Sequence, residues 1–381
     1  MTTRGVSQGG EPISVKTPFL TKRRVIIIIS LMVFLAFFGL PLLNILGKMA
    51  DSPKQLLQQI IVGLTKGTYL AIIALGYTLV YGIIELINFA HAEVYMIGAF
   101  ASLSLISIFG LNDAANKPSG LQIALLLPII LILVMTFTAL LNVSIELLAY
   151  RRLRNAPRLA PLISAIGVSF ILQNVGILWG DRKLWNGIGL TSVGQAMGSS
   201  AVGPKSFPPL LPSGQVFFIP ESWFVLAYKD LLVILISLSL LAALYLFVRY
   251  TKLGKAMRAT AQDRDAARLM GINANRTISL TFLIGGALAG AAGMLVGLYN
   301  GTAVFNMGFT AGLLSFTAAV LGGIGNILGS ALGGLLIGLF LALSDQYINA
   351  RWSNAVIFGI LVLILVFRPT GLLGEEGGQK A

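Results

Sequence analysis

One long stretch of the chain contains no charged residue, and this stretch constrains the fold more than any other feature. Between Thr277 and Ser344 there is no Asp, Glu, Lys, Arg or His, in a chain of 381 residues that is 56% hydrophobic and 11% charged. Soluble globular proteins carry about 25% charged residues. A helix of about 20 apolar residues crosses a lipid bilayer, and the tract has room for several. The sequence therefore predicts an all-α polytopic membrane protein.

Apolar runs of spanning length recur along the rest of the chain. Together with the uncharged tract they predict about ten transmembrane helices, or about eight if two adjacent runs are dropped. The 43 glycines fit this class, because small residues let helix backbones approach closely in lipid. The predicted spans are Val25–Leu46, Gly67–Ile84, Val94–Phe109, Leu121–Leu148, Leu159–Gly180, Leu231–Val248, Thr277–Leu298, Thr310–Gly323, Leu328–Leu343 and Trp352–Phe367.

The basic residues predict which ends of these helices face the cytoplasm. Cytoplasmic loops of membrane proteins are enriched in Lys and Arg. With ten spans, the strongly basic segments fall on one side: Lys22–Arg24, Tyr150–Arg158, Arg249–Arg276 and Arg368. This predicts a polar cytoplasmic tail at 1–24, a transmembrane domain at 25–368 with an extracytoplasmic loop at 181–230 and a cytoplasmic segment at 249–276, and a cytoplasmic tail at 369–381.

The segment Arg249–Arg276 carries seven Lys or Arg residues and two Asp. Thr251 is suited to cap a helix over Lys252–Met270, and Gly271 is suited to the left-handed residue that ends one. Such a helix presents a small, mostly apolar face framed by basic residues. Two interpretations remain open, a helix that docks into a partner protein and a basic helix that lies on anionic lipid. The face comprises Ala256, Ala259, Asp263, Ala267 and Met270, and the frame comprises Lys255, Arg258 and Arg268.

Two stretches, Leu79–Leu103 and Met294–Gly323, have the same design. Each ends a span in an aromatic and glycine cluster, passes through a polar segment with Asn and Phe, and enters a helix of small residues. With ten spans they cross in opposite directions, which predicts the inverted repeats of many transporters. The alternative is that glycine-rich membrane helices resemble one another by composition alone.

The first of these stretches contains the only histidine of the chain, His91. Ionisable groups inside a bilayer are costly, so they usually face a cavity or a partner. One interpretation places Asn88, Phe89, His91 and Glu93 along a substrate path, with Phe305 and Asn306 of the second stretch. The other makes the first four residues a turn at the water interface. One His and one Glu two residues apart are too few ligands for a zinc site.

Other polar residues have simpler interpretations. Lys66 and Glu85 flank a predicted span and suit boundary positions with snorkelling side chains. Interhelical hydrogen bonds explain three polar residues within another span, Ser164, Gln173 and Asn174.

Enzymatic signatures are missing from the sequence. The chain has no cysteine, which excludes disulfides and thiolate chemistry. Gly254-Lys255 is followed by Ala256, so no phosphate-binding loop of the form G-x-x-x-x-G-K-[ST] is present. We therefore expect no enzyme active site, metal or cofactor on this chain, and no nucleic-acid partner.

Several motifs in the chain are shared with a known family. They are Gly76–Gly82, Ile87–Glu93, Gly254–Ala259 with Asp263, Ala267 and Gly271–Ile272, then Gly308–Phe309, Phe316–Gly325 and Phe367–Gly374. In this order they resemble LivH-type permeases, the inner-membrane subunits of bacterial branched-chain amino acid ABC importers. The resemblance covers most of Leu64–Gly374. Two departures stand out. Ala92 lies where the family usually has Gly, and the polar N-terminal tail and an insertion around Asn112–Gly120 are longer than the resemblance leads us to expect.

The resemblance implies a permease that imports branched-chain or other neutral amino acids across the bacterial inner membrane. It implies a second homologous permease, a periplasmic binding protein, and two cytoplasmic ATPases that use ATP and Mg²⁺. The expected fold is similar to the vitamin-importer class of ABC permeases, which contains inverted repeats. The residues expected to couple to the ATPases are Gly254, Arg258, Ala259, Asp263, Ala267, Gly271 and Ile272.

Other functions remain open from the sequence. Closely similar permeases carry urea, short amides or other small polar solutes. An ion-coupled secondary transporter needs an ionisable residue within a span, and Thr277–Ser344 has none. A structural scaffold is also compatible with uncharged spans, although the polar breaks between them do not favour it.

Overall fold

The computed structural model describes residues 47–48, 51–85, 88–112, 118–153, 156–157, 159–219, 224–368 and 370–374. Contacts within the chain separate residues 1–53 from residues 54–381, and the description below concerns the second unit. The predicted span Val25–Leu46, the tails at 1–24 and 375–381, and most of the stretch Asn112–Gly120 lie outside the described residues.

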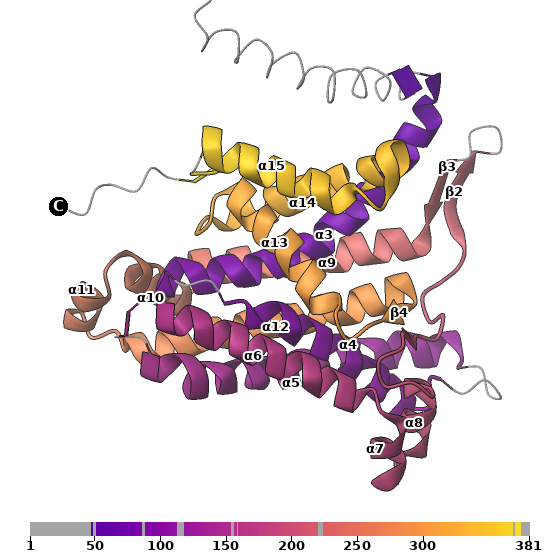
Figure 1. Ribbon diagram of the computed structural model, residues 1–381, viewed down its shortest axis with the longest axis horizontal. Helices are drawn as coiled ribbons and strands as arrows, with labels where there is room; N and C mark the ends of the chain where they lie inside the picture. Colours follow the sequence, from indigo (N-terminus) through magenta and orange to yellow (C-terminus); the bar gives the residue numbers. More distant parts are fainter. Residues whose placement is uncertain are drawn as a thin grey trace, which may run out of the picture. The chain divides into compact units, whose positions relative to one another are not determined.

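Long apolar helices form most of this unit (Figure 1). In the described part of the chain, seven helices are long and apolar enough to cross a membrane, and two shorter ones are equally apolar. Each predicted span from Gly67 onward coincides with one of these helices, so the predicted positions are confirmed as apolar helices. The helices are α3 (Pro53–Ile84), α4 (Ala90–Ile108), α5 (Gly120–Ile145), α6 (Leu159–Trp179), α9 (Tyr228–Tyr250), α12 (Ala274–Asn300), α13 (Met307–Gly322), α14 (Ile327–Ser344) and α15 (Ser353–Phe367).

Helices α5 and α14 do not end as plain α-helices. A π-helical turn, Glu146–Tyr150, and a 3₁₀ turn, Arg151–Leu153, follow α5, and a second π-helical turn, Asp345–Asn349, follows α14. Single π-turns are rare in proteins and occur frequently at functional sites. Both turns carry side chains that take part in the polar contacts described below.

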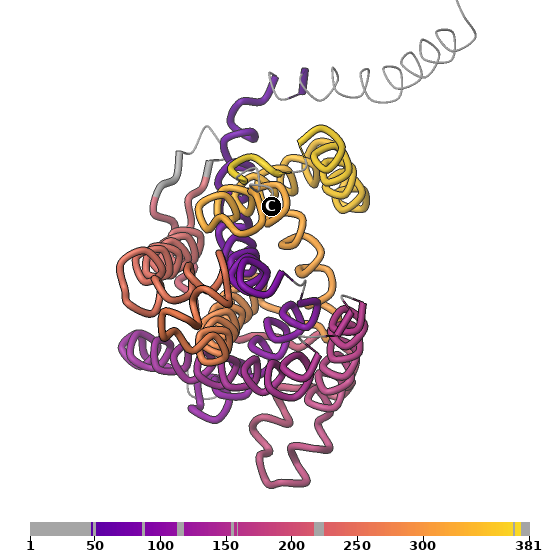
Figure 2. Tube along the Cα trace, turned by 90° about the vertical axis from the view of Figure 1, so that its left-hand side faces the viewer, coloured from indigo at the N-terminus to yellow at the C-terminus, as the bar shows by residue number. Residues whose placement is uncertain are grey.

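Glycines allow the backbones of neighbouring helices to touch directly, with no side chain between them. A Cβ added to Gly98 of α4 would lie 2.7 Å from the Cα of Gly290 in α12, and one added to Gly338 of α14 would lie 2.2 Å from the Cα of Gly67 in α3. Helices in lipid associate through such close contacts, because no hydrophobic force drives them together. In both views α14 and α15 lie on one side of α3, and α5 and α6 lie on the opposite side (Figures 1 and 2).

The helices have a basic end and an opposite end. Two short helices, α10 (Lys252–Gln262) and α11 (Arg264–Leu269), lie at the basic end, at the left of Figure 1. Arg264 contacts the end of α3 there, and the segment after α15 folds back so that Leu372 donates to the carbonyl of Leu321. The strands and the helices α7 and α8 lie at the other end, at the right of Figure 1.

The segment 181–230, predicted as a loop, contains regular structure. It holds α7 (Arg182–Gly187), α8 (Thr191–Met197) and the strands β1 (Lys205–Ser206), β2 (Gln215–Ile219) and β3 (Phe224–Ala227). β2 pairs antiparallel with β3, and β1 pairs antiparallel with β4 (Thr302–Ala303), with Lys205 opposite Ala303. The all-α prediction is therefore wrong in this detail. The strands are short, and short pairings of this kind leave little signal in a sequence.

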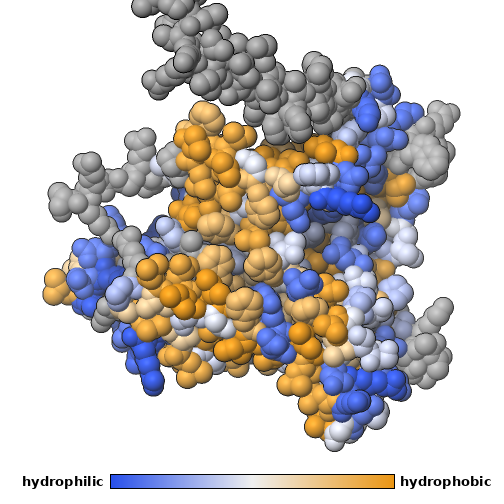
Figure 3. Space-filling model, viewed as in Figure 1, coloured by the Kyte–Doolittle hydropathy of each residue, from blue (hydrophilic) through white to orange (hydrophobic). Residues whose placement is uncertain are grey.

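The outer helices expose apolar side chains, whereas the central ones are buried. Most residues of α3, α4 and α12 are buried, and α5, α6 and α9 expose large hydrophobic residues such as Leu125, Phe170 and Leu235. In Figure 3 hydrophobic side chains cover the helices, and hydrophilic ones gather toward the two ends. This surface matches a protein that is surrounded by lipid along its helices and by water at both ends.

Candidate functional site

The α10–α11 loop at the basic end is built from local capping contacts. The Thr251 hydroxyl accepts a hydrogen bond from the Gly254 N–H at 3.0 Å, which starts α10, and Gly271 follows α11 with φ = +80°. Both predictions are confirmed. Gly254 also packs against backbone, because a Cβ there would lie 2.3 Å from the Val248 carbonyl oxygen. The turn from α9 into α10 therefore requires glycine at this position.

The predicted single helix over Lys252–Met270 is wrong, because the helix breaks at Asp263. The Asp263 backbone is extended, and its carboxylate accepts hydrogen bonds from the N–H groups of Asp265 and Ala266 at 2.8 and 3.0 Å. An Asp side chain competes with the helix for backbone N–H groups and is a good N-cap. Asp263 therefore begins a second helix, α11, instead of lying on an apolar face.

This break also changes the exposure of the predicted face. Ala267 is buried, whereas Met270 is 82% exposed, and the neighbouring Leu269 is 89% exposed. Leu269 and Met270 form an apolar tip at the end of α11. Sequence reasoning assigned no role to Leu269, because a continuous helix placed it off the apolar face. The available signal was the apolar pair directly before Gly271.

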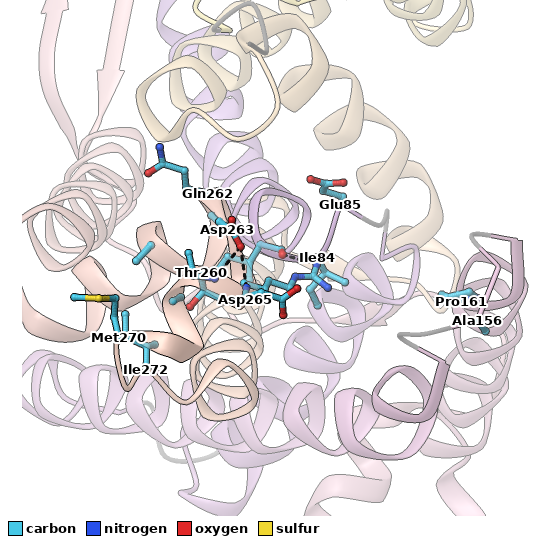
Figure 4. Close-up of a pocket in the computed structure, with 16 residues that line it drawn as sticks. Ile84, Glu85, Ala156, Pro161, Thr260, Gln262, Asp263, Asp265, Met270 and Ile272 are labelled. Carbon is cyan, nitrogen blue, oxygen red and sulfur yellow. Dashed lines mark hydrogen bonds between the residues drawn. The ribbon is translucent and has the colours of Figure 1, made fainter. Parts of the chain in front are cut away.

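A cleft of about 1000 Å³ lies between the α10–α11 loop and the ends of α3 and α6. Figure 4 shows Asp263 and Asp265 beside Ile84, the last residue of α3, with Glu85 beyond it and Ala156 and Pro161 farther away. Most of the predicted coupling residues line this cleft: Ala259, Asp263, Ala267 and Ile272. Gly254 and Gly271 shape the loop, and Arg258 donates to the Arg249 carbonyl at 3.2 Å and lines a neighbouring pocket.

A second group of predicted residues lies inside the helix bundle. Asn88, His91 and Glu93 are at most 4% exposed, so these three side chains are not open to water, although Phe89 does lie in a turn before α4. The Tyr150 hydroxyl, in the π-turn after α5, donates to the Asn88 side chain at 2.7 Å. The His91 ring meets the Tyr77 ring edge-on at 5.0 Å, and packs so closely on Gly76 that a Cβ there would lie 2.1 Å from Nε2.

Glu93 joins three helices. Its Oε1 accepts hydrogen bonds from Gln173 at 2.8 Å and Ser169 at 3.2 Å, both on α6. Its Oε2 lies against Gly308 at the start of α13, where a Cβ would approach to 2.3 Å. The first turns of α4 and α13 therefore cross inside the bundle, and a second contact joins Ala92 to Gly312.

The remaining predicted residues lie around this crossing. Phe89 is half-buried beside Phe316, with ring centroids 6.5 Å apart, and Phe305 is half-buried near Gly176 of α6. Asn306 precedes α13 and is exposed. The structure thus brings Phe305 and Glu93 to neighbouring parts of α6, whereas it does not bring Asn306 into the buried group.

The polar residues of α6 divide into two kinds. Gln173 makes the predicted interhelical hydrogen bond through Glu93. Asn174 instead donates to the Phe170 carbonyl of its own helix, so the interhelical prediction is wrong for Asn174. Ser169, which sequence reasoning missed, lies one helical turn before Gln173 and contacts the same carboxylate. Its i, i+4 spacing to Gln173 was the signal for it.

Two cations at the opposite end have defined partners. The Nζ of Lys66 donates to Asp345 of the second π-turn at 2.7 Å, and both side chains are partly exposed. Lys205 is 1% exposed, and its Nζ donates to the carbonyls of Gly180, Met197 and Ser200 at 2.5–2.8 Å. Burial lowers the pKa of Lys205, against the opposing attraction of Asp181. The ammonium group ties the ends of α6 and α8 together.

Among the residues that the structure describes, no three His, Asp or Glu side chains come together as a metal site could require. The two candidate regions are the α10–α11 loop at the basic end and the buried polar contacts between α4, α6 and α13. An interior crossing of two helix starts and an exposed loop at one end are features of transport proteins more than of catalysts.

Comparison with known proteins identifies the family. The family described as branched-chain amino acid transport system / permease component matches residues 59–365. The chain belongs to this permease family. The permease is 42% identical over 325 residues to the high-affinity branched-chain amino acid transport system permease protein BraD of Pseudomonas aeruginosa, across 85% of this chain and 97% of BraD. It is 39% identical over 327 residues to the permease protein LivH of Escherichia coli, across 85% and 97%.

More distant matches and the solved structures complete the comparison. The xylose transport system permease protein XylH of Escherichia coli is 27% identical to the permease over 207 residues, across 52% of this chain and 50% of XylH. No solved structure matches the permease. The resemblance predicted from the sequence motifs is confirmed, and the permease is a multi-pass membrane protein of the transport class.

Proposed function

We propose that the permease is the membrane subunit of an ABC importer that moves branched-chain or other neutral amino acids inward across a bacterial inner membrane. The observation that carries this proposal is its identity of 42% and 39% to BraD and LivH, across 97% of each. Both relatives are named as branched-chain amino acid permease proteins. The likeness extends over the spans and the α10–α11 loop, because the family match covers residues 59–365.

The proposed orientation places the basic end in the cytoplasm. Arg249, Arg264 and Arg276 gather there, and cytoplasmic loops favour such residues. With the apolar run Val25–Leu46 counted as a span, about ten spans result and both termini face the cytoplasm. The strands and α7 and α8 then face the periplasm, where a substrate-binding protein would dock.

ATP and Mg²⁺ would be used on two separate cytoplasmic ATPase chains, and a second homologous permease would complete the pore. The apolar tip Leu269–Met270 supports this arrangement, because such large exposed side chains at a water-facing end favour burial in a partner. The break at Asp263 sets this tip on a separate short helix, which a partner could hold in a groove.

We also propose that the α3–α4 and α12–α13 segments are inverted repeats around the substrate path. The crossing of the first turns of α4 and α13 supports this, because interrupted helices in transporters direct their N-termini at mid-membrane sites. A neutral amino acid carries an ammonium and a carboxylate group. Glu93 offers a negative charge whose Oε2 has no hydrogen-bond partner among the described residues, and the helix N-termini offer N–H donors.

Along the proposed path, the residues of the first repeat are Asn88, Phe89, His91 and Glu93, and those of the second are Phe305 and Asn306. Asn306 is exposed and directly precedes α13, on the proposed periplasmic side of that helix. It would meet substrate before Phe305 and Glu93.

Reconstitution tests the transport function directly. The permease is assembled in lipid vesicles with its partner permease, both ATPases and the binding protein, and uptake of labelled leucine is measured. Uptake should require ATP and survive collapse of the proton gradient with a protonophore. Leucine uptake by the permease alone, driven by an ion gradient, would contradict the proposal.

The path is tested separately with Glu93→Gln, which keeps the shape of the side chain and removes its charge. We expect leucine uptake to fall while the complex still assembles. Asn174→Ala is the control, because Asn174 lies on α6 next to Gln173 but bonds only within its own helix in the described contacts. Wild-type uptake in Glu93→Gln would remove Glu93 from the path.

A further inference from the structure

A charged hydrogen bond joins the α10–α11 loop to the end of α3. The guanidinium Nη2 of Arg264, the first residue of α11, donates to the Ile83 carbonyl oxygen at 2.7 Å. Ile83 is the penultimate residue of α3, and the last four carbonyls of a helix lack intrahelical partners. The last turn of α3, Tyr81–Ile84, carries no Lys or Arg of its own. Arg264 therefore supplies the cation that favours a helix C-terminus.

The end of α3 that Arg264 holds has an unusual backbone. Glu85 follows Ile84 with φ = +60°, and it is the only non-glycine residue with positive φ in the part of the chain that the structure describes. A left-handed conformation costs a residue with a Cβ roughly 1–2 kcal/mol. Backbone strain of this kind clusters at active sites and switch regions.

Glu85 precedes the residues of the buried polar crossing by only a few positions in the sequence, with residues 86–87 outside the described part of the chain. Asn88 is held by Tyr150, α4 begins at Ala90, and Glu93 then contacts α6 and α13. If the end of α3 moves, the start of the segment that positions His91 and Glu93 therefore moves with it.

The other end of α11 is free to be held by a partner. Leu269 and Met270 are 89% and 82% exposed, and the cleft of about 1000 Å³ separates α11 from Ala156 and Pro161 (Figure 4). The N-terminus of α11 is fixed by the Asp263 cap and by Arg264, whereas its C-terminus protrudes. The short helix is thus anchored on α3 at one end and exposed at the other, with space beside it.

We propose that Arg264 is the positioning residue that passes movement of the α11 tip to the end of α3 and Glu85, and from there along the chain to the buried crossing of α4 and α13. The proposal rests on the proposed function, because it assumes that an ATPase moves the tip. It assigns the link between ATP hydrolysis and the substrate path to one side chain, which touches neither ATP nor substrate.

The test uses the complete importer in lipid vesicles and measures ATP hydrolysis and leucine uptake on the same preparation. Arg264→Met removes the charge and keeps most of the volume. We expect ATP hydrolysis within about twofold of wild type and an uptake rate lower by about tenfold or more, since a lost hydrogen bond to a charged group commonly changes an equilibrium by this factor. The ATP consumed per leucine should rise by the same factor, and Arg264→Lys should restore part of the coupling.

Arg268→Met is the matched control. Arg268 lies on the same helix, is exposed, and pairs with Asp265 of its own loop at 3.1 Å. Its removal should leave the ratio of ATP to leucine unchanged. A charge effect on ATPase docking would lower hydrolysis and uptake together in both variants.

Three outcomes would overturn the proposal: an unchanged ratio in Arg264→Met, a parallel loss of hydrolysis and uptake, or failure of both Arg264→Met and Arg264→Gln to assemble. The last would assign Arg264 to folding. Failure of the proposed function is recognised separately, because the wild-type complex and Arg268→Met would then also fail to take up leucine. If wild type carries another solute, the ratio is measured with that solute.

Discussion

Gly76 and His91 touch at a distance that no other side chain at position 76 could tolerate. A Cβ on Gly76 would lie 2.1 Å from Nε2 and 2.3 Å from Cε1 of His91, and these are the two nearest atoms. The His91 ring is 0% exposed and is packed edge-on against Tyr77, so it cannot rotate away without disturbing other buried groups. Gly76→Ala should therefore destabilise the permease.

The magnitude follows from two opposing effects. Forcing an extra methyl into a packed interior costs about 1–3 kcal/mol, and the short contact in this site favours the upper part of that range. Ala stabilises a helix interior by about 1 kcal/mol relative to Gly. The net loss in unfolding free energy for Gly76→Ala should be about 2 kcal/mol.

His91→Ala removes the side chain that causes the clash. Alone, it leaves a cavity and should cost about 2–4 kcal/mol, by comparison with other large-to-small changes. In the double variant the methyl group introduced at position 76 occupies part of that cavity and the clash is gone. The double variant should be about 2–3 kcal/mol more stable than the sum of the single changes predicts.

Denaturant titration of the purified permease in mixed micelles, followed by tryptophan fluorescence, measures these free energies. Gly82→Ala is the control on the same helix, because the nearest atom to its Cβ is the Gly325 Cα at an ordinary 3.6 Å. The control should raise the unfolding free energy by up to about 1 kcal/mol, the helix preference of Ala over Gly, and should not lower it. Additivity of Gly76→Ala and His91→Ala within about 0.5 kcal/mol would refute the packing described for His91.

Two further predictions concern stability away from the crossing. Lys205→Met should speed hydrogen exchange of the 181–204 amides and lower the free energy of unfolding by about 2 kcal/mol or more, because three carbonyls lose their donor. The control Lys183→Met, at an exposed position, should have neither effect. Equal exchange in both variants would contradict the role of the Lys205 ammonium. Gly338→Ala should prevent stable packing of α14 on α3, because its Cβ would lie 2.1 Å from the backbone nitrogen of Gly67. The control Gly359→Ala should fold normally, because no atom lies within 4 Å of its Cβ. Thermal stability in detergent distinguishes the two variants, and similar values would disprove the close approach of α14 to α3.

Features that depend on neighbours in the sequence were predictable. The positions of the spans follow from runs of apolar residues, since a backbone in lipid must satisfy its hydrogen bonds within a helix. The Thr251 cap and the Gly271 end involve contacts over a few residues, and both could be read from residue type. The gathering of basic residues at one end was equally visible as charge along the chain.

Local competition limited the prediction of the α10–α11 loop. An Asp within an amphipathic pattern can continue a helix or cap a new one, and the pattern over Lys252–Met270 suited the first. The structure selects the second, because Asp263 bonds to two N–H groups while Arg264 reaches the end of α3. A contact between residues 83 and 264 leaves no periodic signal in either segment.

The order of residues was thus enough to predict a polytopic membrane protein, where its helices run, and which ends are basic, because lipid imposes length and polarity rules on each segment separately. The permease family was predicted from the resemblance of its motifs, and the family match confirms it. Packing in three dimensions established that Asn88, His91 and Glu93 are buried, that α4 and α13 cross at Glu93 and Gly308, and that Lys66 pairs with Asp345, 279 residues away. Those facts depend on which helices pack together. The packing is set by close backbone contacts between glycines that are far apart in the sequence, so no single segment determines it.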